Sequence, residues 1–371
     1  MNGKPIPSSR NQIRQIVLQP STFCNINCSY CYLPDRISHK KMSIETISQL
    51  CTRLLAYGNF AGRLEIRWHA GEPLAVPVQF YEQALEIIHS RLHGLTQITH
   101  SMQTNAISLT DEWCCFLKKN GFRIGVSIDG PLHIHDRHRL TKSGKGTFDL
   151  AMKGIALLKK HAIGFDVITV LTKYSLSYPD EIYTFLHDLQ PLSIGFNVEE
   201  TEGVNASKSF SEPHFMEDYN IFLQRIYTLQ EIYGTQVREL RDICNAIIYN
   251  EGERINLLSN PLSILSVDWE GNMSTFSPEL LSFPLYIFGN IYRQDITDML
   301  SHPQFNEANH AIQAGVQQCK DECGFFEICG GGSPSNKLWE NNSFNSTSSA
   351  YCDARFKVPA QIIIEHLENS C

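Results

Sequence analysis

Two hydrophobic spacings alternate along the first half of the chain: short apolar runs typical of buried strands, and longer segments with apolar residues at helical spacing. In the segment after Ser43, a good N-cap residue, Ile44, Ile47 and Leu54 fall on one helical face. We predict strands at residues 15–19, 64–68, 98–103, 122–128, 165–171 and 193–196. We predict helices at residues 44–55, 79–92, 110–119, 148–161 and 179–189. Six strands alternating with helices predict an α/β fold with a parallel sheet and right-handed crossovers.

The pattern changes in the second half. Residues 213–250 are predicted to be helical and to bridge two domains. Residues 264–268 and 273–276 are short strand signals around Trp269-Glu270-Gly271-Asn272, which predicts a hairpin. A helix at residues 358–367 closes the chain. We therefore expect a barrel domain at 1–210, a helical bridge at 211–259 and a small α+β domain at 260–371.

Composition excludes two classes of protein. Lys and Arg total 31 and Asp and Glu total 39, so the net charge of −8 argues against a nucleic-acid-binding protein. No apolar run approaches the length of a membrane span, and the polar N-terminus lacks the apolar region of a signal peptide. We expect a soluble cytoplasmic protein. Because the first strand begins by residue 15, we expect no separate N-terminal domain for binding a leader peptide.

Three cysteines follow the first predicted strand with the spacing C-x3-C-x2-C: Cys24, Cys28 and Cys31. One tight loop brings their thiolates to one metal centre, whereas a closed zinc site or iron–sulfur cube has four ligands. Three ligands leave one position open for a small molecule. Buried free cysteines are the alternative, since cysteine often packs as a small hydrophobe. Asn25 and Ser29 make this loop polar and argue for the metal centre.

This stretch closely resembles the signature of the radical S-adenosylmethionine (SAM) superfamily. The resemblance implies that Cys24, Cys28 and Cys31 hold a 4Fe–4S cluster whose open iron binds SAM. One electron, from a donor such as ferredoxin or flavodoxin, then cleaves SAM to a 5′-deoxyadenosyl radical that abstracts hydrogen from the substrate. The resemblance also implies a partial (β/α)6 TIM-like barrel, which fits the six predicted strands.

Further motifs at the ends of predicted strands resemble SAM-binding positions of this superfamily. Ala70-Gly71-Glu72-Pro73 is similar to the Gly-Gly-Glu-Pro motif that binds the SAM amino group, although an ordinary turn is the alternative. Ala70 replaces the first glycine, which is tolerable unless the position requires a positive φ. The resemblance implies these cofactor-binding residues: Tyr30, Gly71, Glu72, Pro73, Gln103, Asn105, Ser127 and Arg139.

Acidic and histidine side chains near the same strand ends have less defined roles. Glu199 and Glu200 follow the sixth strand, and Glu279 follows the hairpin; each is a candidate proton acceptor, with a solvated loop as the alternative. The histidines at positions 133, 135 and 138 are expected in a solvated loop rather than at a metal site.

A second cysteine group lies near the C-terminus and comprises Cys319, Cys323, Cys329 and Cys352. Four thiolates complete a closed iron–sulfur cluster, and zinc is the alternative. The group resembles a SPASM domain, the auxiliary-cluster domain of radical SAM peptide maturases, which usually has seven cysteines and two clusters. Ser333 stands at one usual cysteine position, and the stretch Ser274-Thr-Phe-Ser277 also lacks one. We therefore expect one auxiliary 4Fe–4S cluster. The remaining cysteines, at 51, 114, 115, 244 and 371, are expected to be structural or incidental.

The C-terminal segments Gly330-Gly-Gly-Ser-Pro334 and Glu340-Asn-Asn-Ser-Phe344 are similar to cyclophane-forming maturases of the GrrM/OscB type. This resemblance implies a ribosomal precursor peptide as substrate and a carbon–carbon bond between an aromatic ring and a nearby Cβ. Two alternatives are formylglycine formation, as in sulfatase maturases, and a non-catalytic iron–sulfur scaffold that binds peptides.

Overall fold

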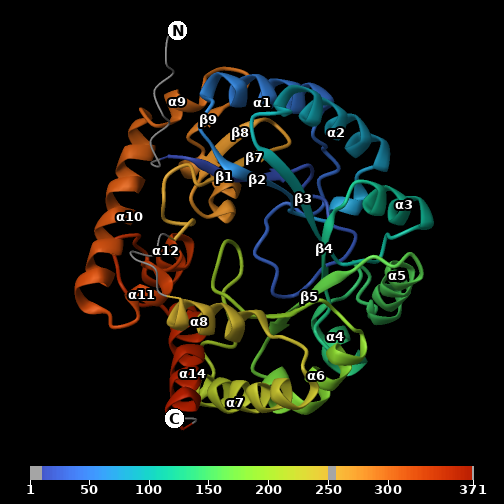
Figure 1. Ribbon diagram of the computed structural model, residues 1–371, viewed down its shortest axis with the longest axis vertical. Coiled ribbons are helices and arrows are strands. Elements are labelled where there is room, and N and C mark those ends of the chain that lie inside the picture. Colours follow the sequence, from blue (N-terminus) through green and yellow to red (C-terminus); the bar gives the residue numbers. More distant parts are fainter. Residues whose placement is uncertain (1–10, 250–255, 370–371) are drawn as a thin grey trace.

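The computed structural model describes residues 11–249 and 256–369. One open sheet of nine strands organises it, in the order β6-β5-β4-β3-β2-β1-β7-β8-β9. The first six strands are β1 (Ile13–Gln19), β2 (Phe60–Trp68), β3 (Gln97–Thr104), β4 (Arg123–Ser127), β5 (Phe165–Leu171) and β6 (Ile194–Val198). Each pairs in parallel with the next. The predicted α/β fold with a parallel sheet is confirmed, and the sheet curls into a partial barrel (Figure 1).

Helices cover the outer face of the curled sheet (Figure 1). They are α1 (Ile44–Tyr57), α2 (Val78–Leu92), α3 (Asp111–Lys119), α4 (Leu132–His138), α5 (Phe148–Lys160) and α6 (Pro179–Asp188). Helix α1 begins where its sequence predicts, because the Ser43 side chain accepts a hydrogen bond from the backbone N–H of Thr46 at 3.1 Å. It ends at Gly58, whose φ of 68° is left-handed.

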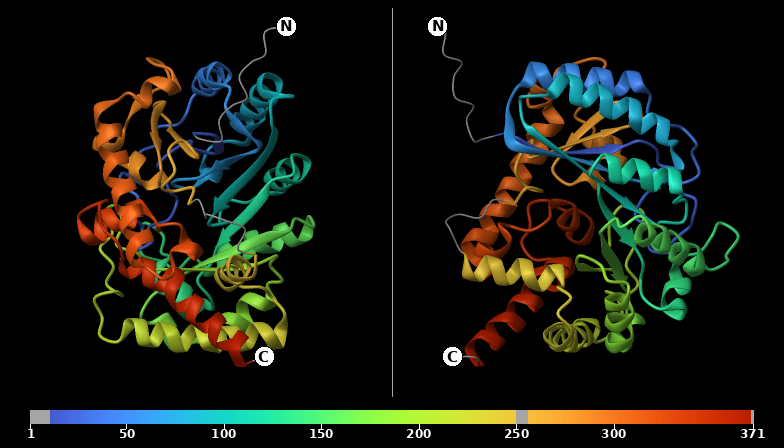
Figure 2. Two further views of the ribbon diagram at one scale, coloured as in Figure 1. Left: turned by 60° about the vertical axis from the view of Figure 1, so that its left-hand side comes forward. Right: turned by 45° about the vertical axis from the view of Figure 1, so that its right-hand side comes forward.

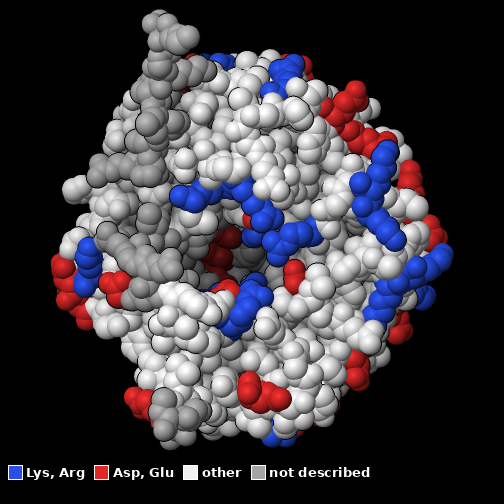
Figure 3. Space-filling model, viewed as in Figure 1, with Lys and Arg blue, Asp and Glu red and all other residues white. Residues whose placement is uncertain are grey.

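The two faces of each barrel strand differ in polarity. On β2, Leu64, Ile66 and Trp68 are buried in the hydrophobic core. The alternate residues Glu65 and Arg67 line a polar cavity inside the barrel. A closed barrel is filled by branched apolar side chains, whereas this lumen is polar and hollow. Figure 3 shows the hollow at the centre of one face, with Lys and Arg around its opening and acidic side chains inside.

The second half of the chain extends the same sheet. After α7 (Phe215–Tyr233) and α8 (Arg238–Ile248), β7 (Ile264–Asp268) pairs in parallel with β1. Strand β8 (Asn272–Thr275) pairs antiparallel with β7, as the hairpin signal predicts, and β9 (Gly289–Asn290) follows. The remaining helices are α9 (Ile296–Met299), α10 (Pro303–Glu322), α11 (Phe326–Cys329), α12 (Pro334–Asn341), α13 (Ala350–Cys352) and α14 (Val358–Asn369). Most of them gather on one side of the molecule (Figures 1 and 2).

The division into domains at residues 210 and 259 stays a prediction. Residues 250–255 of the predicted bridge and Cys371 lie outside the described residues. Among the described residues, no helix is long and apolar enough to cross a membrane.

One local prediction is wrong. The segment with three histidines is helix α4 rather than a solvated loop, and His135 is buried at 1% exposure. Its Nδ1 accepts a hydrogen bond from the Asp129 N–H at 3.4 Å, and its Nε2 lies 3.1 Å from Oγ1 of Thr147. These two contacts satisfy both ring nitrogens, so the imidazole packs inside the protein as a structural group.

Candidate active site

A cavity of about 370 Å³ opens at the C-terminal ends of the barrel strands, and we refer to it as the central cavity. It is lined by these residues singled out from the sequence: Cys24, Cys28, Tyr30, Cys31, Gly71, Glu72, Gln103, Asn105, Ser127, Arg139, Glu199, Glu200 and Glu279. Pro73 is buried at the start of a short helical turn and is not among the lining residues. The fold therefore brings together residues from the cysteine loop, four strand ends and the hairpin segment.

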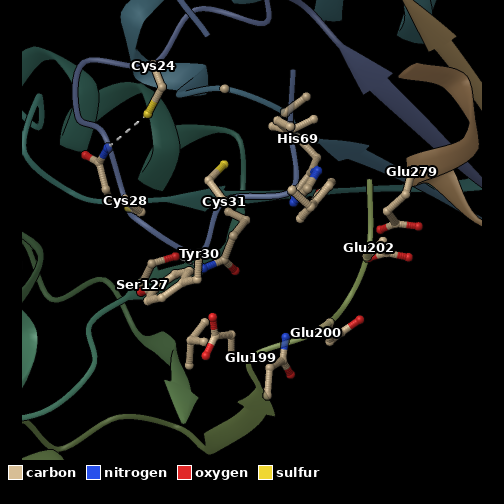
Figure 4. A pocket seen from close by; sticks show the side chains of 18 of the residues that line it. Cys24, Cys28, Tyr30, Cys31, His69, Ser127, Glu199, Glu200, Glu202 and Glu279 are labelled. Carbon is tan, nitrogen blue, oxygen red and sulfur yellow. Dashed lines mark hydrogen bonds between the residues drawn. The ribbon is translucent and has the colours of Figure 1, made fainter. Parts of the chain in front are cut away.

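Backbone hydrogen bonds to distant segments fix the loop that carries the first three cysteines. The N–H of Cys24 donates to the carbonyl of Arg36 at 3.1 Å, and the N–H of Ser29 donates to that of His138 at 3.0 Å. The Arg36 side chain also donates to the Cys28 carbonyl at 3.2 Å. The Cys24 thiol lies 3.9 Å from the Asn105 amide nitrogen, drawn as a dashed line in Figure 4. The loop is thus held from both sides before any metal binds.

The three thiols fit a cluster with three protein ligands. Burial raises the pKa of Cys24 to about 12 and that of Cys28 to about 11, so both thiols hold protons that a bound metal would displace. Within the described ranges, no three His, Cys, Asp or Glu side chains are arranged around a single metal ion. A 4Fe–4S cluster has another requirement, because each thiolate binds its own iron. Three cysteines lining one cavity meet that requirement.

The segment Ala70-Gly71-Glu72 lies against the cysteine loop. The N–H of Glu72 donates to the Phe23 carbonyl at 2.8 Å, and a Cβ on Gly71 would lie 2.3 Å from the same oxygen. Only glycine permits this approach. Ala70 has a φ of 76°, so this position does have the left-handed conformation that favours glycine.

The Glu72 carboxylate is 1% exposed and fully engaged by the protein. One oxygen accepts from Thr104 Oγ1 at 2.6 Å and from the Leu74 N–H at 3.0 Å, and the other accepts from the Asn105 N–H at 2.8 Å. Burial raises the pKa of Glu72, and the three hydrogen bonds offset this effect only in part. Glu72 therefore fixes the end of β3 beside the cysteine loop, and its contact with SAM stays a prediction.

Tyr30, Asp129 and Arg139 form one buried polar cluster beneath the cysteine loop. The Tyr30 hydroxyl donates to one oxygen of Asp129, and Arg139 forms an ion pair with the other oxygen at 3.0 Å. The guanidinium also lies 3.9 Å from the sulfur of Cys28. Asp129 positions both of the predicted SAM-contacting side chains. Asp129 was not singled out from the sequence.

The acidic residues of the cavity separate into two kinds. The Glu199 carboxylate is held by the N–H and hydroxyl groups of Ser209 and by the Lys208 N–H, so it closes a loop. Glu200, Glu202 and Glu279 instead face one another across from the cysteines (Figure 4), and we name them the acidic group. Burial raises the pKa of Glu200 to about 7, and burial together with both neighbours raises that of Glu202. Glu202 was missed from the sequence.

The second cysteine group lines a separate cavity of about 290 Å³, which we refer to as the auxiliary cavity. It is formed by Cys319, Cys323, Cys329 and Cys352 together with Gly331 and Lys357. Burial raises the pKa of Cys352 to about 12 and also raises that of Cys329. Four thiols around one cavity fit a closed cluster, in which each thiolate binds its own iron. Within the described residues these thiols are not arranged around a single ion such as zinc.

One thin wall separates the two cavities. Ser333 and Ser335 line the central cavity, whereas Gly331 lines the auxiliary cavity. Tyr351 lines the first and its neighbour Cys352 lines the second. A group bound by the second cysteines would therefore lie directly behind the central cavity.

Comparison with known sequences identifies the family. Residues 18–186 match the Radical SAM superfamily. A serine-type anaerobic sulfatase-maturating enzyme of Bacteroides thetaiotaomicron is 31% identical over 342 residues, which cover 85% of this chain and 81% of the relative. The chain belongs to the radical SAM superfamily. Membership implies an enzyme with a 4Fe–4S cluster and SAM as cofactors, which the three thiols of the central cavity fit.

Solved structures share the fold of this radical SAM protein over nearly its whole length. The structure described as native anSMEcpe with bound AdoMet has a TM-score of 0.79 and 20% identity, and the match covers 96% of this chain and 98% of that one. Streptococcus suis SuiB bound to precursor peptide SuiA has a TM-score of 0.65 and 15% identity, covering 92% of this chain and 76% of that one. At these identities the likeness shows the fold.

Proposed function

We propose that this radical SAM enzyme modifies a ribosomally made precursor peptide and joins an aromatic ring carbon to the Cβ of a nearby residue, forming a three-residue cyclophane. The observation that supports it most is the central cavity, where a cysteine triad faces an acidic group and a four-cysteine cavity lies behind the wall. The family resemblance of the C-terminal segments supports the cyclophane branch.

A peptide substrate is supported by the names of similar proteins. The Bacteroides relative is a sulfatase-maturating enzyme, and SuiB was solved with its precursor peptide. A central cavity of about 370 Å³ has room for a few side chains, so the rest of the peptide must lie outside it.

When bound, SAM and its cluster supply a radical that removes a hydrogen atom from the peptide, and an auxiliary cluster supplies an acceptor for one electron. Cys24, Cys28 and Cys31 would hold the first cluster, and the four later cysteines would hold the second. A protein such as ferredoxin or flavodoxin is the proposed electron donor.

The chain's own residues provide the proton acceptor. Restoring aromaticity after ring attack requires the loss of one proton and one electron from the peptide. Glu200, Glu202 and Glu279 are close enough to influence one another, and a carboxylate whose pKa lies near 7 accepts protons well at neutral pH. The Asn336 amide donates to Glu200 at 2.9 Å and fixes its orientation. Glu199 is the less suited candidate, because Ser209 and Lys208 already donate hydrogen bonds to its oxygens.

A second candidate function is formylglycine formation, which the 31% identity to a serine-type sulfatase-maturating enzyme favours. The family resemblance implies that sulfatase maturases use two auxiliary clusters. This chain has Ser333 at one usual cysteine position, and that side chain lines the central cavity. The missing cysteine ligands for one of the two auxiliary clusters favour cyclophane formation over formylglycine formation.

The decisive experiment is anaerobic co-expression of the enzyme with candidate precursor peptides, followed by tandem mass spectrometry. Crosslinking and oxidation of serine to formylglycine both remove two hydrogen atoms, so the mass change alone does not separate them. A cyclophane resists fragmentation between the joined residues and does not react with a hydrazide. A product that reacts with the hydrazide and fragments throughout would establish the sulfatase-maturase activity instead, and an unchanged mass would exclude both.

A further inference from the structure

Lys337 is a buried lysine beside the auxiliary cavity. It lies on α12, and 4% of its surface is exposed. Its Nζ donates to the carbonyl of Gly315 at 3.2 Å and to the sulfur of Cys319 at 3.3 Å. Among the described residues, no carboxylate forms an ion pair with this ammonium.

A buried ammonium without a counter-charge destabilises a fold, because its lost hydration is not replaced by an opposite charge. One carbonyl oxygen does not balance a full charge. The sulfur of Cys319 does so when it is a thiolate, and metal binding is what converts a buried thiol to a thiolate. The position of Lys337 therefore indicates that Cys319 serves as an anionic ligand.

Lys357 provides the contrast, because it lines the auxiliary cavity itself. Its Nζ lies 2.8 Å from Asp353, so a carboxylate on its own helix already balances its charge. Lys357 is also more exposed, with 26% of its side chain accessible. Lys357 interacts with Cys352 through charge, whereas Lys337 donates a hydrogen bond directly to a cysteine sulfur.

We propose that Lys337 is the counter-charge of the auxiliary cluster and that its hydrogen bond to Cys319 raises the reduction potential of that cluster. The inference rests on the proposed function, in which this cluster accepts one electron from the peptide while the acidic group accepts the proton. Reduction adds a negative charge, and a fixed positive charge in a site of low dielectric favours the more negative state. Hydrogen bonds to cluster sulfurs shift potentials in the same direction.

The test measures a potential rather than turnover. The full-length chain with Cys24, Cys28 and Cys31 replaced by Ala isolates the auxiliary cluster, which is then titrated by electron paramagnetic resonance. Lys337→Met is expected to lower the ratio of reduced to oxidised cluster about tenfold at a given potential. This change corresponds to a midpoint potential that is lower by about 59 mV for one electron. Lys337→Arg, which keeps the charge, is expected to restore most of the parent value. Lys357→Met is the control at a lysine that Asp353 already balances, and its shift is expected to be smaller.

The outcomes separate the inference from the proposed function. If the parent chain binds no iron at the second cysteines, the auxiliary cluster is wrong and the proposed electron acceptor fails with it. If iron binds and the midpoint of Lys337→Met equals that of the parent, the role of Lys337 is wrong while the cluster stands. Should Lys337→Met fail to retain iron, Lys337→Gln keeps a hydrogen-bond donor without the charge. An unchanged midpoint in that variant would equally overturn the proposal.

Discussion

Buried polar side chains around the central cavity differ in how completely the protein satisfies them. Glu72 accepts three hydrogen bonds, and Asp129 pairs with both Tyr30 and Arg139. The carboxylates of the acidic group instead face one another, and burial together with their neighbours raises the pKa of Glu200 and of Glu202. Well-satisfied groups fix geometry, whereas poorly satisfied acids retain protons at neutral pH and are able to exchange them.

Glu200 makes the stability of the enzyme depend on pH. Burial raises its pKa from 4.5 to about 7, so between these values the folded chain binds more protons than the unfolded chain. The free energy of unfolding is therefore expected to fall as pH rises through that window, by on the order of 1–3 kcal/mol for this group. Glu200→Gln should remove this part of the slope in chemical denaturation at the two ends of the window. Glu86→Gln, on an exposed part of α2, is the matched control, and an equal slope in both variants would contradict the assignment.

Ala70 offers a test of backbone strain beside the cysteine loop. A left-handed non-glycine residue costs about 1–2 kcal/mol, and glycine returns about 0.4–1 kcal/mol of that through the unfolded chain. Ala70→Gly is therefore expected to stabilise the chain by about 0.5–1 kcal/mol in thermal denaturation. Gly71→Ala, one residue along, is expected to disrupt the cysteine loop, because its Cβ would meet the Phe23 carbonyl. A destabilised Ala70→Gly variant would show that the methyl group has a packing role that outweighs the strain.

At the scale of elements, local pattern was sufficient for most of the barrel. Strand β5 has the predicted bounds, and α1 begins after its predicted cap, Ser43. Helix α3 begins one residue after its predicted start and is capped by Thr110. The carboxyl ends of parallel strands lie at the same edge of the sheet, so the residues that follow these strands could be expected to line one cavity. What the sequence did not predict depends on long-range pairing: the junction of β7 with β1, and the short strand β9.

The same physical reason explains which site residues were missed. Cys24, Cys28 and Cys31 are close in sequence, and their spacing alone indicates a shared centre. Glu202 and Lys337 gain their importance only from distant partners, Glu279 and Cys319. No periodicity or spacing encodes such a contact, so only the folded chain reveals it.

Helix α13 is an element whose position depends on one side chain. The Glu340 carboxylate accepts from the backbone N–H groups of Ala350 and Tyr351, just before Cys352. Glu340→Ala leaves these donors without a partner, at a local cost of about 1–3 kcal/mol, and is expected to displace Cys352. The variant should lose iron from the auxiliary cavity and keep the first cluster, measured as iron per chain. Glu327→Ala, at an exposed position of α11, is the control. Full iron in Glu340→Ala would show that the cluster holds the loop without Glu340.

At the scale of the whole molecule, one continuous sheet places two cysteine sites on either side of a thin wall. Strand β7 extends the barrel sheet next to β1, and the chain after it returns to the open side of the barrel (Figure 2). The second site therefore does not depend on a flexible tether. This arrangement predicts that the two sites are filled separately but act on one substrate.

Iron content and product analysis test that arrangement together. Ligand sets of three and four cysteines predict two 4Fe–4S clusters and about eight irons per reconstituted chain. Replacing Cys24, Cys28 and Cys31 by Ala should leave about four irons and abolish 5′-deoxyadenosine formation, because the open iron that binds SAM is lost.

Replacing the four later cysteines should leave SAM cleavage and stop crosslinking, because the peptide then has no acceptor for its electron. Circular dichroism must show that this variant is folded, since metal binding and folding are coupled in small polar domains. A folded variant without the auxiliary cluster that still crosslinks its peptide would exclude the electron-acceptor role, and close to twelve irons in the parent chain would reveal a third cluster despite Ser333.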